Sequence, residues 1–499
     1  MPLRSSKTES TEQSPGNIWN TIVRITNSVG SDEAKAIRVL LYLVLLAGRE
    51  STLWERLRSR VNFARRMALP RGKPVPAGRK GCPLFAFLYD TPANTNNLLP
   101  VFQAAQKRGL RPYVLSGEGF DLSRKGFTGA SGSVGVREIR SLTTTTEWLA
   151  ALTGARKHFA AVSAEFERQA PQCIPLIRKG RAGIESELAL AMVATLGLTR
   201  IYTNWQPSFV ISTSNMWPFD CAVFDQAARL GIPSFVVQHG VTNRYWWPFV
   251  ASKMLLWGKA FEKELLNLGA PAAQLAIGGM PAADHLFSRY QDVSRDVGKT
   301  ASSFLILSDT QTRHLYPEPY DKFRILFKAV VAATPTIRWS IKLHPLEDDS
   351  FYREMLGGRF PNFSILPKAT SLEDAVRQSD VACTLWSTSG LESMMMRRPL
   401  LVFDLDPMVY EHAWWPQCGG GTYAPTTEAV LAFVRKASSD PHFIAELVTR
   451  QDQFLAENFA NPGRAAEAVL DTIEEAVRTS KSGISFGANN PHHAEAVSR

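Results

Sequence analysis

Cysteine is scarce in this chain. Only 5 of the 499 residues are cysteine, and they lie far apart, at positions 82, 173, 221, 383 and 418. Their number is odd and no CxxC pair occurs. Disulfide frameworks and zinc sites need paired or clustered cysteines, so the sequence predicts neither and favours a reducing compartment.

Long apolar runs are lacking as well. The longest covers residues 39–47, about half of the ~20 residues that a membrane-spanning helix needs. The first 16 residues are polar, which does not fit a signal peptide. We therefore expect no integral membrane segment and a cytoplasmic location.

The body of the chain has no excess of positive charge. The formal net charge is +10, but residues 1–80 carry 15 Lys and Arg against 6 Asp and Glu, and residues 81–499 carry 41 against 40. A nucleic-acid-binding body would be basic, so we expect no nucleic acid partner. At 45% hydrophobic and 10% aromatic, a chain of this length predicts two globular domains with extensions.

The basic N-terminal segment predicts two helices after a tail at residues 1–16. One covers 32–47 and is capped by Ser31, and the other covers 51–69 with apolar residues on one face and arginines opposite. Such a helix can lie on an anionic membrane, and it can equally pack on the protein body. We predict an anionic membrane partner through residues 31–80, which makes the protein peripheral on the inner face of the cell membrane. The packing alternative stays open.

From residue 81 onward, short apolar strands alternate with helices, which predicts parallel sheets covered by helices. The expected strands are 84–89, 113–116, 209–213, 234–238, 253–257, 304–307, 338–342, 381–385 and 400–403. The expected helices are 98–108, 218–230, 320–333, 372–378, 391–396, 426–437 and 443–474, with a helical region at 145–200 and a polar loop at 90–97.

We expect an α/β fold with two Rossmann-like, doubly wound parallel-sheet domains that face a cleft. The N-terminal extension with its linker covers 1–80, the first domain 81–298, the second domain 299–478, and a disordered tail 479–499.

Polar clusters follow four of the predicted strands. Ligands of doubly wound sheets bind at the carboxyl ends of the strands, so these clusters are the candidate sites. They are Gln238-His239-Gly240, Lys342 with His344, Ser387-Thr388-Ser389-Gly390 with Glu392, and residues 308–313 with Arg313. Asp90, after the first strand, is a further candidate.

Each cluster has a chemical and a structural interpretation. Hydroxyl residues and a glycine that begin a helix offer N–H groups to a diphosphate, and the same spacing of Ser or Thr and Glu is a capping box. Lys342 and His344 can neutralise phosphate charge. His239 can act as a general base, or it can shape its loop through a hydrogen bond.

Several catalytic motifs are absent. The chain has no GxxxxGK[ST], no GxGxxG after a strand, no HExxH and no GxSxG. These absences argue against a P-loop enzyme, a zinc protease and an α/β-hydrolase. We expect neither a metal nor a resident cofactor.

Taken in order, the clusters resemble motifs of bacterial glycosyltransferases with two Rossmann-like domains, the GT-B fold. The matching residues are Phe235-Val-Val-Gln-His-Gly240, Leu256-Trp-Gly258, Gly278-Gly-Met-Pro281 with Asp284, Lys342-Leu-His-Pro345 and Ser387-Thr-Ser-Gly-Leu-Glu392. The similar enzymes make surface polysaccharide: capsule and lipopolysaccharide transferases, including Kdo and sialic acid polymer types, and CDP-glycerol glycerophosphotransferases. The chain has Gln-His-Gly-Val where the last family usually has Trp-His-Gly-Thr. It also lacks the Asp-Ser-Gly-Gly element of the related UDP-N-acetylglucosamine 2-epimerases.

The resemblance implies a nucleotide-sugar donor in the C-terminal domain and an acceptor in the N-terminal domain. The implied donor residues are Arg313, Lys342, His344, Ser387, Thr388, Ser389, Gly390 and Glu392, with Glu392 on the ribose or sugar. His239 is the implied catalytic residue, and Gln238, Gly240 and Asp90 lie toward the acceptor.

The implied function is metal-independent transfer of a sugar to a lipid-linked or polysaccharide acceptor in capsule or other surface polysaccharide synthesis. The alternatives are a glycerophosphotransferase of the CDP-glycerol type, an enzyme like UDP-N-acetylglucosamine 2-epimerase, and a non-catalytic, membrane-tethered assembly factor for a polysaccharide complex.

Overall fold

A computed structural model provides the fold. It describes residues 15–38, 40–41, 45, 75, 79–88, 91–117, 121–242, 246–290, 299–308, 317–344, 347, 349–356, 359–385, 387–403 and 420–481. The helix predicted at 51–69 and two candidate site residues, Asp90 and Arg313, lie outside these ranges.

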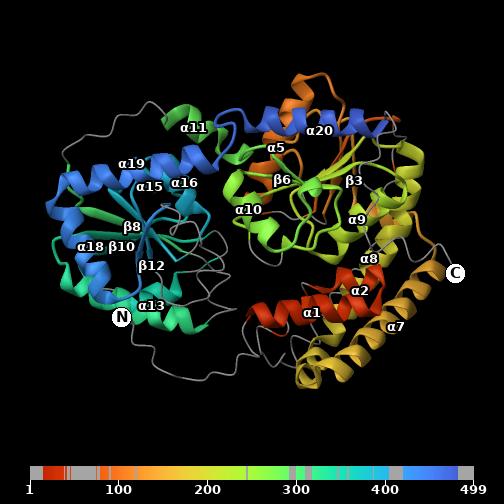
Figure 1. The fold of residues 1–499 in the computed structure, drawn as a ribbon, viewed down its shortest axis with the longest axis horizontal. Helices are drawn as coiled ribbons and strands as arrows, with labels where there is room; N and C mark the ends of the chain where they lie inside the picture. The colour runs from red at the N-terminus through yellow and green to blue at the C-terminus, as the bar shows by residue number, and fades with distance from the viewer. Residues whose placement is uncertain are drawn as a thin grey trace.

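Two parallel sheets form the centres of two α/β domains (Figure 1). Within the described residues, the first sheet has the strand order β3-β2-β1-β4-β5-β6-β7 and the second has β10-β9-β8-β11-β12-β13. The strands of the first are β1 Leu84–Phe87, β2 Tyr113–Ser116, β3 Gly132–Gly135, β4 Val210–Ser212, β5 Ser234–Val237, β6 Lys253–Leu256 and β7 Leu275–Ile277. Those of the second are β8 Ser303–Leu307, β9 Arg338–Lys342, β10 Phe363–Ile365, β11 Val381–Thr384, β12 Leu400–Phe403 and β13 Thr422–Ala424. The fold class predicted from the sequence is confirmed.

Helices cover both faces of each sheet, as crossover connections between parallel strands require. In the first half they are α1 Pro15–Val29, α2 Asp32–Ala36, α5 Pro92–Lys107, α6 Val136–Ser141, α7 Thr145–Gln169, α8 Ile174–Trp205, α9 Pro218–Arg229, α10 Lys259–Asn267 and α11 Asp284–Tyr290. In the second half they are α13 Pro317–Ala333, α14 Ser350–Leu356, α15 Leu372–Arg377, α16 Ser389–Met395, α18 Thr427–Ser439, α19 Pro441–Asn458 and α20 Ala465–Lys481.

Strand β1 shows why the central strands are apolar throughout. All four of its residues are buried. Leu84 and Ala86 belong to the core cluster that contains α8 and α9, whereas Phe85 and Phe87 belong to the cluster that contains α5 and α20. Alternate side chains point to opposite faces, so a strand covered by helices on both faces needs apolar residues at every position.

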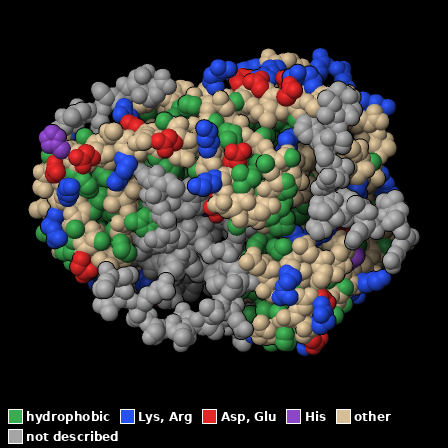
Figure 2. All heavy atoms as spheres, viewed as in Figure 1, with side chains coloured by type: hydrophobic (Ala, Val, Ile, Leu, Met, Phe, Trp, Pro, Cys, Tyr) green, Lys and Arg blue, Asp and Glu red, His purple; other side chains and the backbone are tan. Residues whose placement is uncertain are grey.

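The end of the chain crosses back to the first domain. The sequence predicts one helix over 443–474, but the structure has two, α19 and α20, separated at residues 459–464. Pro462 and Gly463 stand in this break, where proline disfavours a continuous helix. Apolar residues of α20 then join the core cluster of β1 and α5, and α20 lies along the upper edge of the molecule (Figures 1 and 2). By its packing, α20 therefore belongs to the first sheet, not to the C-terminal domain predicted at 299–478.

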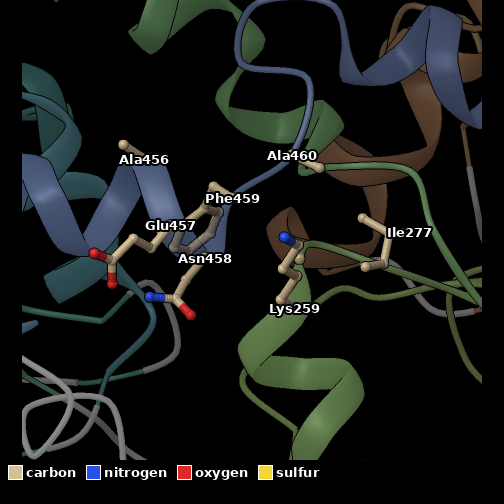
Figure 3. A pocket seen from close by; sticks show the side chains of 8 residues that line it. Lys259, Ile277, Ala456, Glu457, Asn458, Phe459 and Ala460 are labelled. Atoms are coloured by element: carbon tan, nitrogen blue, oxygen red, sulfur yellow. The ribbon is translucent and has the colours of Figure 1, made fainter.

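Glycines of the motifs that resemble glycosyltransferases make this crossing possible. A Cβ atom on Gly258 would lie 1.6 Å from the backbone oxygen of Asn458, and one on Gly279 would lie 2.4 Å from that of Ala460. Asp284 accepts hydrogen bonds from the backbone nitrogens of Ala465 and Ala466 at 2.8 and 2.9 Å, and so begins α20. The small pocket at this junction, about 360 Å³ in volume, is shown in Figure 3. These motif residues thus hold the two halves of the chain together.

The N-terminal helices pack on the body of the first domain. Trp19, Ile22 and Ile25 of α1 are buried in a cluster with Phe159 and Phe166 of α7. This helix corrects the expected tail, because residues 15 and 16 already belong to it. The predicted Ser31 cap is confirmed, since its hydroxyl accepts from Ala34 N at 3.1 Å. Of the two alternatives, membrane binding and packing on the protein body, the structure shows α1 and α2 packed on the body.

Several other helices and strands differ from the sequence prediction in their bounds or were not predicted. Helix α5 begins at Pro92 with Thr91 as its cap, so most of the polar loop expected at 90–97 is helical. Strands β3, β7, β10 and β13 are absent from the sequence prediction. Three of them, β7, β10 and β13, have only three residues each, too few for an apolar pattern to stand out.

One helical stretch, Pro171–Trp205, is long and apolar enough to meet a criterion for membrane spans, with a hydropathy of 1.3. It packs against α7 and α9, and Ile184, Leu188 and Leu198 are buried there. Core helices of globular domains meet the same criterion, so we describe α8 as a core helix.

Candidate functional site

The order of strands reverses once in each sheet. In the first sheet β1 lies between β2 and β4, and in the second β8 lies between β9 and β11. Doubly wound sheets bind ligands in the crevice that such a reversal opens at the carboxyl ends of the strands. The clusters around His239, His344 and Ser387 follow β5, β9 and β11, at or next to these two positions.

In the first domain, His239 is held by a group of buried polar residues. Its Nδ1 atom meets the backbone oxygen of Thr213, which follows β4. The Thr213 hydroxyl donates to Asn94 Oδ1 at 2.9 Å, and Asn94 comes from the first turn of α5. The imidazole also lies against the ring of Trp246, with 4.9 Å between ring centroids. Two separate segments thus contact the ring, and a third, through Asn94, holds Thr213.

The contact with Thr213 decides the tautomer of His239. A carbonyl oxygen can only accept, so Nδ1 carries the proton and Nε2 keeps its lone pair. Burial lowers the pKa of His239 to about 4, because desolvation disfavours the charged ring, and the Thr213 carbonyl opposes this only in part. The imidazole is therefore neutral at pH 7 and able to accept a proton at Nε2.

The neighbours of His239 differ in their surroundings. Gln238 is fully buried: its amide nitrogen donates to Gly240 O at 2.9 Å, and its Oε1 accepts from Trp257 N at 2.9 Å. This burial does not fit the acceptor contact predicted for Gln238, and it assigns the side chain to joining β5 and β6. Gly240 is half-buried, and a Cβ there would find only Trp246 at 3.8 Å.

In the second domain, Ser308 connects the ends of β8 and β9. Its hydroxyl accepts from His344 N at 2.8 Å and donates to a carboxylate oxygen of buried Glu347 at 2.5 Å. The side chains of His344 and Lys342 are half-buried. Burial, with a smaller contribution from Lys368, lowers the pKa of Lys342. A cationic side chain that is partly desolvated gains from an anionic ligand.

The third cluster begins helix α16. Ser387 Oγ accepts from Ser389 Oγ at 2.8 Å, and Ser387 N donates to Thr384 Oγ1 at 3.0 Å. Thr388 is the N-cap, and among the described residues its side chain caps no N–H. The three hydroxyl residues are half-buried, and Gly390 is buried within the first turn. The capping-box alternative is therefore not what the structure shows.

Glu392 is the acid of this cluster. Its side chain is half-buried, and no described hydrogen bond or ion pair engages its carboxyl group. Burial raises its pKa to about 7. Hydroxyl donors of a ligand would stabilise the ionised form, because hydrogen bonding to a carboxylate favours its charged form.

The structure thus gathers the predicted residues into two groups, one per sheet. In the first group, His239 contacts Thr213, whose hydroxyl donates to Asn94. In the second, His344 is bonded to Ser308 and Ser308 to Glu347, while Ser387 is bonded to Thr384 and Ser389. No hydrogen bond or ion pair between described residues joins the two groups. Thr213, Asn94 and Glu347 were missed by sequence reasoning, and the only signal was that each lies in a segment that follows a strand of the sheet. Across the described ranges, no cluster of three His, Cys, Asp or Glu side chains could hold a metal ion.

Comparisons with known proteins bear on the fold. No protein-family model matches the chain, and no curated protein matches its sequence. Among solved structures, S. aureus MnaA with UDP is similar at a TM-score of 0.50 and 12% identity, over 80% of this chain and 97% of that one. A UDP-N-acetylglucosamine 2-epimerase from Listeria monocytogenes is similar at 0.50 and 13%, over 79% and 96%. The calicheamicin glycosyltransferase CalG4 is similar at 0.44 and 13%, over 79% and 99%. At these identities the first two similarities show the fold, a two-domain GT-B arrangement.

Proposed function

We propose that the protein is a glycosyltransferase that takes a sugar from a nucleotide-sugar donor. The observation that carries this proposal is the neutral imidazole of His239, held with Nε2 unprotonated beside the strand reversal of the first sheet. In the second domain, hydroxyl side chains, Lys342 and His344 follow strands at or next to the point where the strand order of that sheet reverses. A base for an acceptor and a cradle for a diphosphate are the two parts that the reaction needs.

In the reaction, the acceptor hydroxyl gives its proton to Nε2 of His239 and its oxygen forms a bond to the anomeric carbon. The bond from that carbon to the diphosphate breaks, and the diphosphate leaves with the electron pair. Ser387, Thr388 and Ser389, with Lys342 and His344, stabilise the charge that develops on it. Glu392 accepts hydroxyl donors of the ribose or the sugar. No step requires a metal.

The acceptor in this proposal is a lipid-linked or polymeric glycan of capsule or other surface polysaccharide synthesis. The excess of basic residues in 1–80 supports a location on the inner face of the membrane, where anionic lipids attract such segments. Arg313 and Asp90, which lie outside the described residues, remain proposed donor and acceptor residues respectively.

A second candidate is a 2-epimerase-like reaction on a nucleotide sugar. The similarity of fold to the Listeria epimerase favours it. The missing Asp-Ser-Gly-Gly element opposes it.

One experiment separates these candidates. The purified full chain is offered UDP-, CMP-, CDP- and GDP-sugars, first for binding by calorimetry and then for turnover without acceptor, followed by NMR of the sugar. A transferase binds one donor and hydrolyses it slowly, whereas an epimerase changes the sugar and keeps the nucleotide linkage at equilibrium. His344→Ala should weaken donor binding, with Gly240→Ala as the control. Failure to bind any nucleotide sugar would overturn both candidates.

A further inference from the structure

A large cavity lies beside the N-terminal helices of the first domain. It has a volume of about 1030 Å³ and lies between α1, α2 and the helices α7, α8 and α9. Small-molecule sites usually enclose about 300–1,000 Å³, so its size suits a ligand rather than trapped water. Its walls are largely apolar, with Trp19, Leu188 and Phe249 buried at its edge.

Arg38 gives this cavity an unusual polar feature. Its side chain is only 7% exposed and lines the cavity. Nε donates to Thr26 Oγ1 at 2.7 Å and Nη2 to Asn27 Oδ1 at 2.5 Å, and both acceptors are neutral. Burial lowers the pKa of Arg38 to about 10, which still leaves the guanidinium charged at neutral pH.

The other charged side chains of the cavity wall have described partners, although that of Glu33 is His158 at 3.8 Å, an ion pair only when the histidine is protonated. Arg229 meets Asp32 at 3.0 Å and Asp225 at 2.8 Å, and Lys35 meets Asp32 at 3.2 Å. Glu147 meets Arg200 at 2.6 Å. Among the described residues of the wall, Arg38 is the cation for which no carboxylate lies within 4.0 Å. A buried positive charge without a counter-charge is costly, and an anionic ligand removes that cost.

The cavity also borders the segment that holds His239. Trp246 stacks on His239, and the next residue, Trp247, lines the cavity, where its backbone oxygen accepts from Trp19 Nε1 at 3.1 Å. Asn215, two residues after Thr213, lines it as well. On two separate segments, the cavity wall therefore comes within one or two residues of a residue that contacts the proposed base.

We propose that this cavity binds a hydrocarbon chain that ends in a phosphate, with the phosphate on Arg38 and the chain along the apolar walls. Because Trp247 and Asn215 of the cavity wall lie close in sequence to the residues that contact His239, this ligand is the membrane-derived part of the acceptor. The inference rests on the proposed function for that last role, but the binding itself does not depend on it.

The test uses farnesyl phosphate as the probe, with farnesol and inorganic phosphate as controls, and measures binding to the full chain by calorimetry without any sugar donor. We expect farnesyl phosphate to bind at least tenfold more tightly than farnesol, and inorganic phosphate not to bind measurably. Arg38→Gln should remove the difference between farnesyl phosphate and farnesol while farnesol binding stays. Equal binding of the two amphiphiles to the unaltered protein would overturn the proposal.

A second variant guards against a folding defect in Arg38→Gln. Ala150 lines the cavity from the exposed side of α7, so Ala150→Phe narrows the cavity without disturbing the core. It should weaken both amphiphiles at least tenfold and leave the thermal midpoint unchanged. Unchanged binding in a folded Ala150→Phe protein would place the ligand elsewhere and overturn the site. Binding without sugar transfer would contradict only the proposed function, and transfer without this binding would contradict only the present inference.

Discussion

The Nδ1 atom of His239 meets the backbone oxygen of Thr213, 26 residues earlier in the chain. This contact joins the ends of β5 and β4, and it leaves Nε2 as the only proton acceptor of the ring. An asparagine at position 239 can still donate to the same carbonyl, but it offers no basic nitrogen at the position of Nε2.

We predict that His239→Asn lowers kcat by about 10²- to 10⁴-fold, the usual contribution of a general base. The dissociation constant of the donor should stay the same, because the donor candidates belong to the other sheet. Steady-state kinetics and calorimetry measure the two quantities. An Asn variant with normal kcat and an inactive Ala variant would mean that His239 only shapes its loop.

Glu392 predicts a pH dependence of donor binding. With a pKa of about 7, its carboxyl group is mostly protonated at pH 5.5 and mostly ionised at pH 8.5. Hydroxyl groups of a nucleotide sugar bind the ionised form better, so affinity should rise with pH and level off above about 8. Well below the pKa the change approaches roughly tenfold per pH unit. Calorimetric titrations of the unaltered protein and Glu392→Gln measure it, and the Gln variant should lose this component while the titration of the ligand's own phosphates remains. A variant with the same pH profile would exclude Glu392 from the donor site.

We expect replacement of Gly258 by alanine to lower the stability of the fold strongly. Its Cβ would lie 1.6 Å from a backbone oxygen of the crossing segment, which cannot rotate away. We expect Gly258→Ala to lower the free energy of unfolding by about 3 kcal/mol, the upper part of the range for overpacking. Gly240→Ala is the matched control, because its Cβ would find the nearest atom at 3.8 Å. Urea unfolding of both variants checks the prediction, and equal midpoints would contradict the close approach.

Substitution of Trp19 tests whether α1 is part of the folded first domain. Trp19 is 4% exposed and packs against the first domain, while the adjacent Asn20 is exposed. Trp19→Ala should lower the free energy of unfolding by about 3–5 kcal/mol, as for other buried aromatic residues. Asn20→Ala should change it by less than about 0.5 kcal/mol. Equal stability of the two variants would indicate that α1 leaves the body in solution and is free for a membrane.

Predictions made from the sequence held best where they rested on local patterns. The alternation of apolar strands with helices predicted two parallel sheets, and the Ser31 cap and the main strands were found where expected. Short edge strands such as β10 and β13 were not predicted, because three residues are too few to show a periodic apolar pattern. The break before α20 was missed because the apolar spacing of 443–474 continues across it, and only the contacts of Gly258 and Gly279 reveal the crossing.

The sequence by itself determined the fold class and placed polar residues after the strands. Both follow from local patterns, because the apolar spacing of a strand and its end can be recognised from residues close together in the chain. The tertiary structure alone decided what those residues meet. The Thr213 carbonyl contacts His239 from a distant segment, Asn94 accepts from the Thr213 hydroxyl, Gln238 is buried, and α1 lines a cavity with Arg38 in its wall. Desolvation and hydrogen bonding across the chain set the tautomer of His239 and the pKa values of Glu392 and Arg38, and no local pattern encodes them. The uneven charge of the first 80 residues predicted a partner surface, and the fold added a cavity beside it.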